Sequence, residues 1–405
     1  MNILFLTSSF PRNRFDFHGH FVFRLAQELK KAGHNLAVLA PHAPKTKKKE
    51  DWNGIRINRF TYFFPYSLQK VAYRSGIGPN LKKSILARVQ FPLFIVSQFI
   101  YLLLEIIRFK PKIIIAHWLF PQGFNAVIAA LLFKKKTFLV LHGAALFALK
   151  RMPAGHLLAK FIIRHSYKVI TVSQYLKKEL DSLIGYNSAA SVIPMGTDTD
   201  LFFPGSRTKS RKKLNLPLKV PLILFVGRLI DVKGPQYLIK AFKYVQTSLP
   251  RAQLLIIGTG NKRECLEQQT KKLGLQDHIH FLGRINPKKL PDYYRSVNLL
   301  VCPSVPTPLG EEAFGLTSVE AQACGIPVCV SRSGGLPENL PGGNSSSIFP
   351  PAKSRPMAKV IMNMLKNRSI KKKDIRLSAL RFSWSVVRQK YLNLINKLEK
   401  SNHAK

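Results

Sequence analysis

Two carboxylates beside a glycine are the residues of this sequence best suited to binding a sugar. Glu312 and Glu320 lie in the segment EEAFGLTSVEAQACGIPV, where Gly315 directly precedes a predicted helix over 316–324. The first amides of a helix lack intrahelical acceptors, and the positive end of its dipole favours a phosphate. Glu320, one turn into this helix, is placed to accept hydrogen bonds from vicinal hydroxyls, and Glu312 can reach a sugar hydroxyl from the other side. The alternative is a loop with two surface glutamates.

Two cations in VGRLIDVKG strengthen the first interpretation. Arg228 ends a predicted strand, and Lys233 follows five residues later, before a glycine. A planar guanidinium and a point charge together suit a diphosphate that no metal neutralises. We identify no metal-ligating D-x-D cluster before the segment, so these cations and the helix dipole would take the place of a metal ion. No second carboxylate stands where a double-displacement nucleophile would be needed.

These residues all follow short apolar runs that alternate with predicted helices. Such runs are typical of parallel strands in a sheet covered on both faces. Ligands of such sheets bind beyond the carboxyl ends of the strands. The rhythm restarts after the polar stretch 205–213, so we predict an α/β protein of two doubly wound domains joined near 200–215, with a long loop over 41–60. The predicted strands are ILFLTSS, NLAVLAP, KIIIAHW, TFLVLHG and KVITVS, then PLILFVG, AQLLIIG, IHFLG, NLLVCPS and PVCVSRS.

Composition limits the class of protein. The 405 residues are 46% hydrophobic and 21% charged, which excludes wholesale disorder. Lys and Arg number 64 against 20 Asp and Glu, and the net charge of +44 indicates anionic partners. No recognition helix or stacking platform for nucleic acid is evident, so a specific nucleic-acid partner is not expected. The four cysteines lack CxxC spacing, and the first residues lack a signal-peptide pattern, which favours a cytoplasmic location.

One segment, 91–107, is apolar for 17 residues, at the lower limit of a membrane span. It contains Gln98 and Glu105, so we expect a buried core helix, with a membrane-docking helix as the alternative. Basic residues before the segment would give such a docking face its positive charge toward anionic lipid: Arg74, Lys82, Lys83 and Arg88.

Five motifs stand together in a recognisable order and spacing: VGRLIDVKG, IIGTG, FLGRI, LPDYYRSVNLLVCPS and EAFGLTSVEAQACGIPV. In them, and nearly end to end, the chain resembles the retaining nucleotide-sugar glycosyltransferases of the GT-B class, often called family 4 or group 1. The resemblance implies two Rossmann-like domains facing across a cleft. The acceptor domain would span 1–204 and be completed by a helix over 383–400, and the donor domain would span 205–377.

The resemblance also implies a role for individual residues. Arg228 and Lys233 would hold the donor diphosphate and stabilise it as the leaving group. Glu312 would contact the transferred sugar, Glu320 the ribose, and His142, in LHG, would face the reacting sugar. Further donor contacts are implied at the strand ends and the helix start: Gly19, Gly227, Gly258, Arg284, Ile285, Phe314, Gly315, Leu316 and Thr317.

The implied activity is metal-independent, retaining transfer of a hexosyl-type sugar from a UDP- or GDP-linked donor, with no cofactor. The acceptor, bordered by His117, would be a glycan or lipid-linked glycan in cell-surface polysaccharide or lipopolysaccharide synthesis at the inner face of the cytoplasmic membrane. The first loop departs from the family pattern, with Gly19 where many members have a glycine pair. A GT-B phosphorylase, an epimerase and a non-catalytic nucleotide-sugar-binding scaffold are the alternatives.

Overall fold

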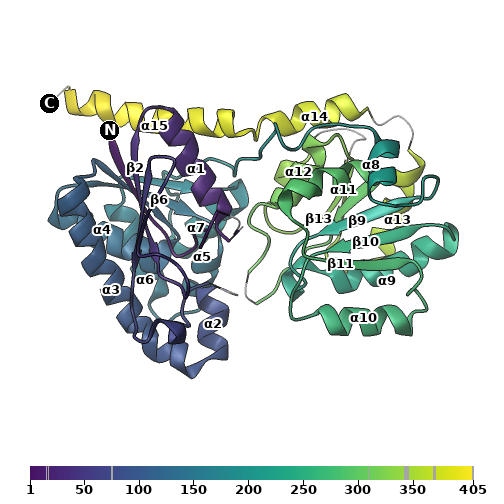
Figure 1. Ribbon diagram of the computed structural model, residues 1–405, viewed down its shortest axis with the longest axis horizontal. Helices are drawn as coiled ribbons and strands as arrows, with labels where there is room; N and C mark the ends of the chain where they lie inside the picture. Colours follow the sequence, from purple (N-terminus) through teal and green to yellow (C-terminus); the bar gives the residue numbers. More distant parts are fainter. Residues whose placement is uncertain are drawn as a thin grey trace. The chain divides into compact units, whose positions relative to one another are not determined.

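The computed structural model describes residues 1–14, 16, 18–73, 76–308, 310–341, 346–367 and 371–403. The chain divides into two units. Unit 1 comprises Met1–Pro194 with Arg388–Lys405, and unit 2 comprises Met195–Val387. Each unit is a sheet with helices packed against it (Figure 1). The parallel α/β class predicted from the apolar runs is confirmed in both.

The sheet of unit 1 has the strand order β3-β4-β2-β1-β5-β6-β7-β8 and is parallel except for β3, which is antiparallel to β4. Because β1 pairs with both β2 and β5, the chain reverses its direction of winding beside β1. The strands are β1 (Asn2–Leu6), β2 (Asn35–Pro41), β3 (Lys49–Trp52), β4 (Ile55–Phe60), β5 (Ile113–His117), β6 (Lys136–Leu141), β7 (Lys168–Thr171) and β8 (Ser191–Val192).

The predicted long loop over 41–60 is wrong from Lys49 onward, because residues 49–60 form the β3–β4 hairpin. Its turn contains Asn53 and Gly54, both with positive φ, at 57° and 76°. An Asn-Gly pair is the preferred sequence for a two-residue hairpin turn, since both residues tolerate that conformation. In β4, Ile55 and Ile57 alternate with more exposed residues and bury their side chains in the core of unit 1.

The helices of unit 1 cover this sheet and include the end of the chain. The last helix, α15, begins in unit 2 and enters unit 1 at Arg388, where the guanidinium pairs with Glu28 of α1 at 3.0 Å. The buried Tyr391 and Ile395 then face the core. The helices are α1 (His20–Lys31), α2 (Ile77–Lys83), α3 (Ile85–Phe109), α4 (Phe124–Leu132), α5 (Ala144–Leu149), α6 (Gly155–His165), α7 (Gln174–Ile184) and α15 (Trp384–His403).

The apolar segment 91–107 lies within α3, which begins after Ser84, whose hydroxyl accepts a hydrogen bond from the Ala87 amide. By length and composition, the helix could cross a membrane. A core helix would be mostly buried, yet only 33% of the most apolar stretch of α3 is buried. Phe94, Gln98 and Leu102 face the core, while the opposite side is exposed. The expectation of a core helix therefore holds for one face and not for the other.

Unit 2 contains a parallel sheet of order β11-β10-β9-β12-β13-β14. Here β9 pairs with both β10 and β12, so the reversal of winding falls beside β9. Crevices at such a reversal are where open α/β sheets bind ligands. The strands are β9 (Leu222–Val226), β10 (Gln253–Ile257), β11 (Ile279–Gly283), β12 (Leu299–Cys302), β13 (Val328–Ser331) and β14 (Ser346–Phe349).

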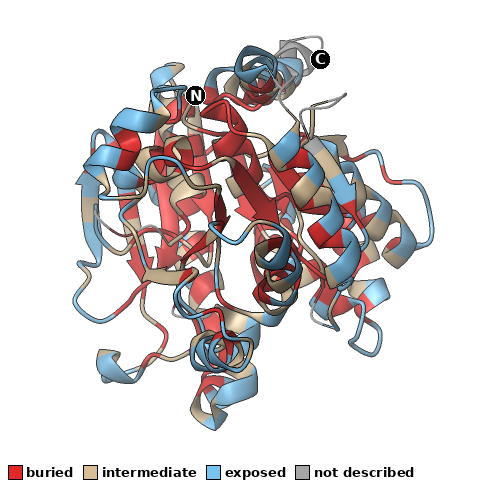
Figure 2. Cartoon of the chain, turned by 90° about the vertical axis from the view of Figure 1, so that its right-hand side faces the viewer, coloured by how far each residue is buried: buried red, intermediate tan, exposed pale blue. Residues whose placement is uncertain are grey.

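The helices of unit 2 form two groups that cover different sides of the sheet. Phe242 of α9 and Ile361 of α13 belong to one apolar cluster with Phe225 of β9, whereas α12 packs on β12 and β13 and contacts α11 and α14. Buried residues run along the strands, and exposed ones mark the outer helix faces (Figure 2). The helices are α8 (Arg207–Lys213), α9 (Pro235–Ser248), α10 (Arg263–Lys272), α11 (Leu290–Ser296), α12 (Leu316–Ala323), α13 (Ser354–Lys366) and α14 (Lys372–Leu380).

The segment 195–204, placed in the first domain by the sequence interpretation, packs with unit 2. Its Thr197 amide donates to the Phe382 carbonyl at 2.7 Å. The Arg376 guanidinium donates to the carbonyls of Thr199 and Phe202, at 2.9 and 2.5 Å. These bonds explain why the structural boundary, between 194 and 195, precedes the predicted one.

Candidate functional site

Glycines allow the strand ends beside the reversal in unit 2 to approach one another closely. The Gly227 amide, after β9, donates to the Ile257 carbonyl at 3.0 Å. Gly258, after β10, has φ 142°, and a Cβ there would overlap the Gly227 carbonyl. A Cβ on Gly234 would likewise overlap the carbonyl of Pro303, which follows β12. Of the two predicted glycines, Gly258 is therefore needed for the ends of β9 and β10 to lie this close, whereas a Cβ at Gly227 would make only ordinary contacts.

Lys233 and Glu312 pair beside this reversal of winding. The Lys233 ammonium, on the turn after β9, pairs with Glu312 Oε2, and the Ser304 hydroxyl donates to the same oxygen at 3.4 Å. Burial would raise the pKa of the Glu312 carboxyl, but Lys233 and Arg228 hold it below its ordinary value. Arg228 itself is exposed. The structure thus brings together three of the predicted catalytic residues as two cations around one carboxylate.

The loop that carries Glu312 is held by the segment after β13. Glu311 accepts a hydrogen bond from the Gly334 amide at 2.7 Å. The Asn339 side chain donates to the Phe314 carbonyl, and Asn339 is itself buried. These contacts fix the path of the chain into Gly315, whose φ of 86° favours glycine. Glu311 and Asn339 were not predicted from the sequence, and no local pattern distinguishes them from ordinary surface residues.

Gly315 caps α12, so of the predicted contacts Leu316 and Thr317 fall in the first turn of that helix, whereas Phe314 and Gly315 precede it. The Ser318 hydroxyl donates to the Gly315 carbonyl at 2.7 Å and tightens the cap. The amides of Leu316 and Thr317 occupy positions that have no acceptor within a helix. They lie at the positive end of the helix dipole, which attracts an anion.

Glu320 lies on the next turn of α12 and receives a hydrogen bond of 2.7 Å from the Tyr294 hydroxyl. Burial raises the pKa of the Glu320 carboxyl to about 7. It also raises the pKa of the Tyr294 phenol well above its ordinary value, so the phenol remains a donor. Glu320 can therefore change protonation near neutral pH. Tyr294, in the LPDYYRS motif, was not assigned to the site from the sequence.

Cys302 is close enough to both Glu312 and Glu320 for their charges to affect its pKa. Its thiol, at the end of β12, lies 3.9 Å from the Thr317 hydroxyl. Burial raises the pKa of this thiol to about 12. The charge of Lys233 acts to lower this pKa, and the charges of Glu312 and Glu320 act to raise it. A thiol that stays protonated is a poor nucleophile, so we assign no step of a reaction to Cys302.

The predicted nucleobase contacts follow β11. Gly283 has φ 68°, after which Arg284 is exposed and Ile285 is half-buried. Nearby, Lys262 pairs with Asp231 at 2.9 Å, beside the turn that carries Lys233. The residues that the structure describes contain no group of three or more His, Cys, Asp or Glu side chains arranged to hold a metal ion.

In unit 1 the two predicted histidines contact each other. His117 ends β5 and His142 follows β6, and Nδ1 of the first lies 2.9 Å from Nε2 of the second. The rings stack with an interplanar angle of 13°, and Phe21 lies 4.8 Å from His142 between ring centroids. Burial lowers the pKa of His142 to about 3 and that of His117 well below its ordinary value. Both rings are therefore neutral at physiological pH.

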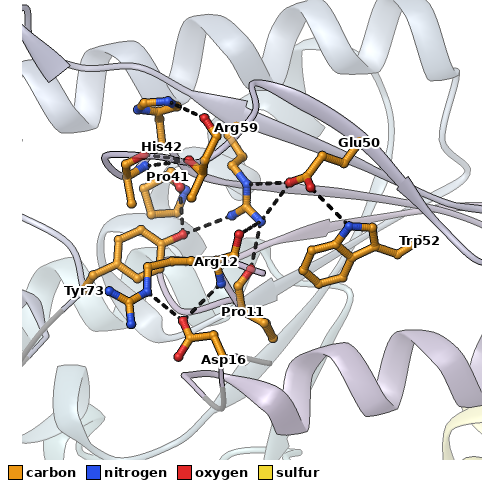
Figure 3. Close-up of polar contacts among 11 residues, drawn as sticks. Pro11, Arg12, Asp16, Pro41, His42, Glu50, Trp52, Arg59 and Tyr73 are labelled. Atoms are coloured by element: carbon orange, nitrogen blue, oxygen red, sulfur yellow. Dashed lines mark hydrogen bonds and ion pairs between the residues drawn. The ribbon is translucent and has the colours of Figure 1, made fainter. Parts of the chain in front are cut away.

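The first loop of unit 1 is anchored by a residue that the sequence interpretation missed (Figure 3). Arg59, fully buried on β4, donates to the Pro11 carbonyl at 2.8 Å and to the Tyr73 hydroxyl at 3.2 Å. Tyr73 in turn donates to the Pro41 carbonyl at 2.8 Å. The alternation of Ile55, Ile57 and Arg59 could have indicated an inward-facing arginine, had the segment been recognised as a strand.

The same loop contains an internal ion pair and ends at the predicted residue Gly19. Arg12 Nε lies 2.7 Å from Asp16. Burial would raise the pKa of Asp16, but hydrogen bonds from Arg12 lower it to about 2. Gly19 has φ 68°, and a Cβ there would overlap the Ser9 carbonyl. Gly19 therefore closes the loop onto itself at the start of α1.

Comparison with known proteins identifies two family regions. The family described as Glycosyltransferase Family 4 matches residues 19–201, and the family described as Glycosyl transferases group 1 matches residues 206–379. The chain is 37% identical over 182 residues to D-inositol 3-phosphate glycosyltransferase of Corynebacterium jeikeium, covering 42% of each chain. It is 31% identical over 184 residues to the GDP-mannose-dependent alpha-(1-6)-phosphatidylinositol monomannoside mannosyltransferase of Mycolicibacterium smegmatis, covering 44% of this chain and 48% of the relative. These matches span less than half the length of either relative.

Solved structures share the fold along almost the whole chain. Sucrose-phosphate synthase from Thermosynechococcus elongatus has a TM-score of 0.79 at 21% identity and covers 99% of both chains. Alr3699/HepE from Anabaena, in complex with UDP, has a TM-score of 0.73 at 18% identity, covering 98% of this chain and 100% of that one. Together with the two family regions, this likeness identifies the fold as GT-B, and the chain belongs to the group 1 (family 4) glycosyltransferases.

Proposed function

We propose that the protein transfers a hexosyl-type sugar, with retention and without a metal ion or other cofactor, from a nucleotide sugar to a glycan or lipid-linked glycan. The observation that carries the proposal is the cluster of Lys233, Arg228 and Glu312 beside the first turn of α12. Two cations and a helix N-terminus can balance a diphosphate, and a carboxylate held ionised can accept a sugar hydroxyl.

In this mechanism the departing diphosphate draws its stabilisation from Lys233, Arg228 and the amides of Leu316 and Thr317. The bond from the sugar's anomeric carbon to phosphate breaks as the acceptor oxygen bonds to that carbon on the same face. The acceptor proton passes to a phosphate oxygen, so charge and atoms balance. Fixed charges in a crevice are effective because they need no reorganisation during the step.

The remaining predicted residues would orient the substrates. Glu320 would accept hydrogen bonds from the ribose, and Arg284 and Ile285 would flank the base. The neutral ring of His142 would form a hydrogen bond with the reacting sugar, with His117 next to it toward the acceptor. A role in cell-surface polysaccharide or lipopolysaccharide synthesis is supported by likeness to WaaG, a glycosyltransferase involved in lipopolysaccharide biosynthesis. The proposed location is the cytoplasmic side of the membrane.

The donor base is proposed to be uracil or guanine. One structural neighbour was solved with UDP-glucose, and one relative is named as GDP-mannose-dependent. The test is thermal stabilisation by UDP, GDP, ADP and their sugar conjugates in EDTA. A ligand at about 100 times its Kd adds about 2.7 kcal/mol to the stability of the native state. We expect a shift with UDP or GDP that Lys233→Ala abolishes and Lys271→Ala, an exposed lysine of α10, retains.

A shift that needs a divalent ion would contradict the metal-free site, and no shift with any nucleotide would contradict the donor site itself. Incubation of the identified donor with acceptor lipid or glycan, followed by NMR of the product's anomeric proton, tests retention. If the protein instead splits a disaccharide with inorganic phosphate and releases a sugar phosphate, the site would be that of a phosphorylase.

A further inference from the structure

The long helix α3 is arranged the opposite way from an ordinary amphipathic surface helix. Its polar side chains face the core: Gln98 accepts from the Asn125 side chain at 3.1 Å, and the buried Glu105 accepts from the Asn58 side chain at 2.9 Å. Every exposed residue between Arg88 and Arg108 is apolar. An apolar face on the outside of a folded unit indicates something that covers it.

The exposed residues form one continuous row along the helix, which we call the α3 stripe. Their spacing of three or four positions puts them on one side. From first to last the row is about 33 Å long at 1.5 Å per residue. Exposed fractions run from 37% at Leu104 to 76% at Ile85. The α3 stripe consists of Ile85, Val89, Pro92, Leu93, Val96, Ile100, Leu104 and Ile107.

Positive charge flanks the α3 stripe at both ends. Arg88 donates to the carbonyls of Leu81 and Lys82, at 2.8 and 3.1 Å, so the basic end of α2 lies against the start of the stripe. Between residues 61 and 112 of the sequence, Glu105 is the only acidic residue. The exposed cations are Lys82, Lys83 and Arg88 at one end and Arg108, Lys110 and Lys112 at the other. Arg74, also predicted to contribute, lies outside the described residues.

We infer that the α3 stripe is a docking surface for an anionic lipid bilayer, on which the helix lies flat. The aliphatic side chains would enter the acyl boundary, and the flanking cations would meet lipid phosphates, the arrangement of interfacial helices. The helix does not leave the unit to span the bilayer, because Gln98 and Glu105 would lose their partners. A second copy is a poor occupant, because both ends of the stripe are cationic and each chain carries +44.

The inference concerns unit 1 alone and is tested without nucleotide, so it can fail while the proposed transfer stands. The measurement is cosedimentation with vesicles of phosphatidylcholine alone and of phosphatidylcholine mixed with phosphatidylglycerol. We expect binding to the mixed vesicles, weakened by salt. The double variant V96Q/I100Q should bind at least about tenfold more weakly. L218Q/L377Q, which changes two leucines exposed in unit 2, should bind as the wild type does.

A second pair of variants tests the contribution of the flanking positive charge to vesicle binding. K82E/K83E should weaken binding several-fold, whereas K271E/K272E, with the same change in net charge on α10, should weaken it less. Binding by V96Q/I100Q equal to that of the wild type would overturn the inference, as would equal binding to neutral vesicles. A wild-type dimer in light scattering that V96Q/I100Q converts to a monomer would assign the stripe to a second copy instead. Unchanged circular dichroism melting of V96Q/I100Q establishes that any loss is not unfolding.

Discussion

His117 Nδ1 and His142 Nε2 share a single hydrogen bond of 2.9 Å in the core of unit 1. The two other ring nitrogens, His117 Nε2 and His142 Nδ1, are buried and have no hydrogen-bond partner among the described residues. Because both rings are neutral, one of these two nitrogens is a donor and the other an acceptor. A group that formed a hydrogen bond with His142 Nδ1 would therefore set the protonation of His117 Nε2 as well.

This pair should make the protein sensitive to acid. The folded-state pKa of His142 is about 3, while an unfolded histidine titrates near 6.5. Below that pH the unfolded chain binds more protons, so stability falls as the pH drops from about 6.5 toward 3. We expect His142→Asn to flatten this part of the stability profile, measured by urea unfolding from about pH 4 to 7. An unchanged slope in the variant would show that other groups cause the loss.

Replacing Glu312 should separate binding from transfer. Its carboxylate pairs with Lys233, so a phosphate that bound this lysine would compete with it. We expect Glu312→Gln to bind the nucleoside diphosphate up to about tenfold more tightly, by calorimetry, because the lysine is released. Release of nucleotide from the donor sugar should fall at least about a hundredfold, since the proposed ionised contact to the sugar would be lost. Weaker nucleotide binding by this variant would show that the pair organises the site.

Glu320 should make nucleotide binding depend on pH near neutrality. Its pKa of about 7 means that the carboxylate, the better acceptor for ribose hydroxyls, forms as the pH rises through 7. Affinity for the preferred nucleotide should therefore increase from about pH 6 to 8 in the wild type and stay level in Glu320→Gln. Calorimetry in matched buffers measures both. A rise that persists in the variant would assign the titration to the phosphate or to another group.

Arg59 should be essential for the stability of unit 1. Its removal would leave the Pro11 carbonyl and the Tyr73 hydroxyl without their buried donor. We expect Arg59→Met to lower the free energy of unfolding by about 3 kcal/mol. Arg56→Met, at an exposed position on the same strand, should change it by less than about 0.5 kcal/mol. Similar losses in both variants would show that the strand, not the buried contacts, is the sensitive feature.

The sequence was most informative where backbone constraints are local. Apolar runs predicted the strands, and Gly258 and Gly315 marked backbone positions that the structure shows to need glycine. Contacts between distant segments were not predictable, because nothing near Asn339 indicates that its side chain holds the Phe314 carbonyl. The apolar length of α3 was evident, but which of its faces is covered depends on the partners of Gln98 and Glu105. Those partners come from other elements.

The placement of α15 has a consequence for the order of folding during synthesis. Unit 2 is complete once Val387 has left the ribosome, but unit 1 still lacks Arg388, Tyr391 and Ile395. Until they emerge, Glu28 has no Arg388 to pair with. The N-terminal unit, although its synthesis starts first, is therefore the last to have all of its residues available for folding. A chain released after Val387 would contain every residue of unit 2 but would lack the last segment of unit 1.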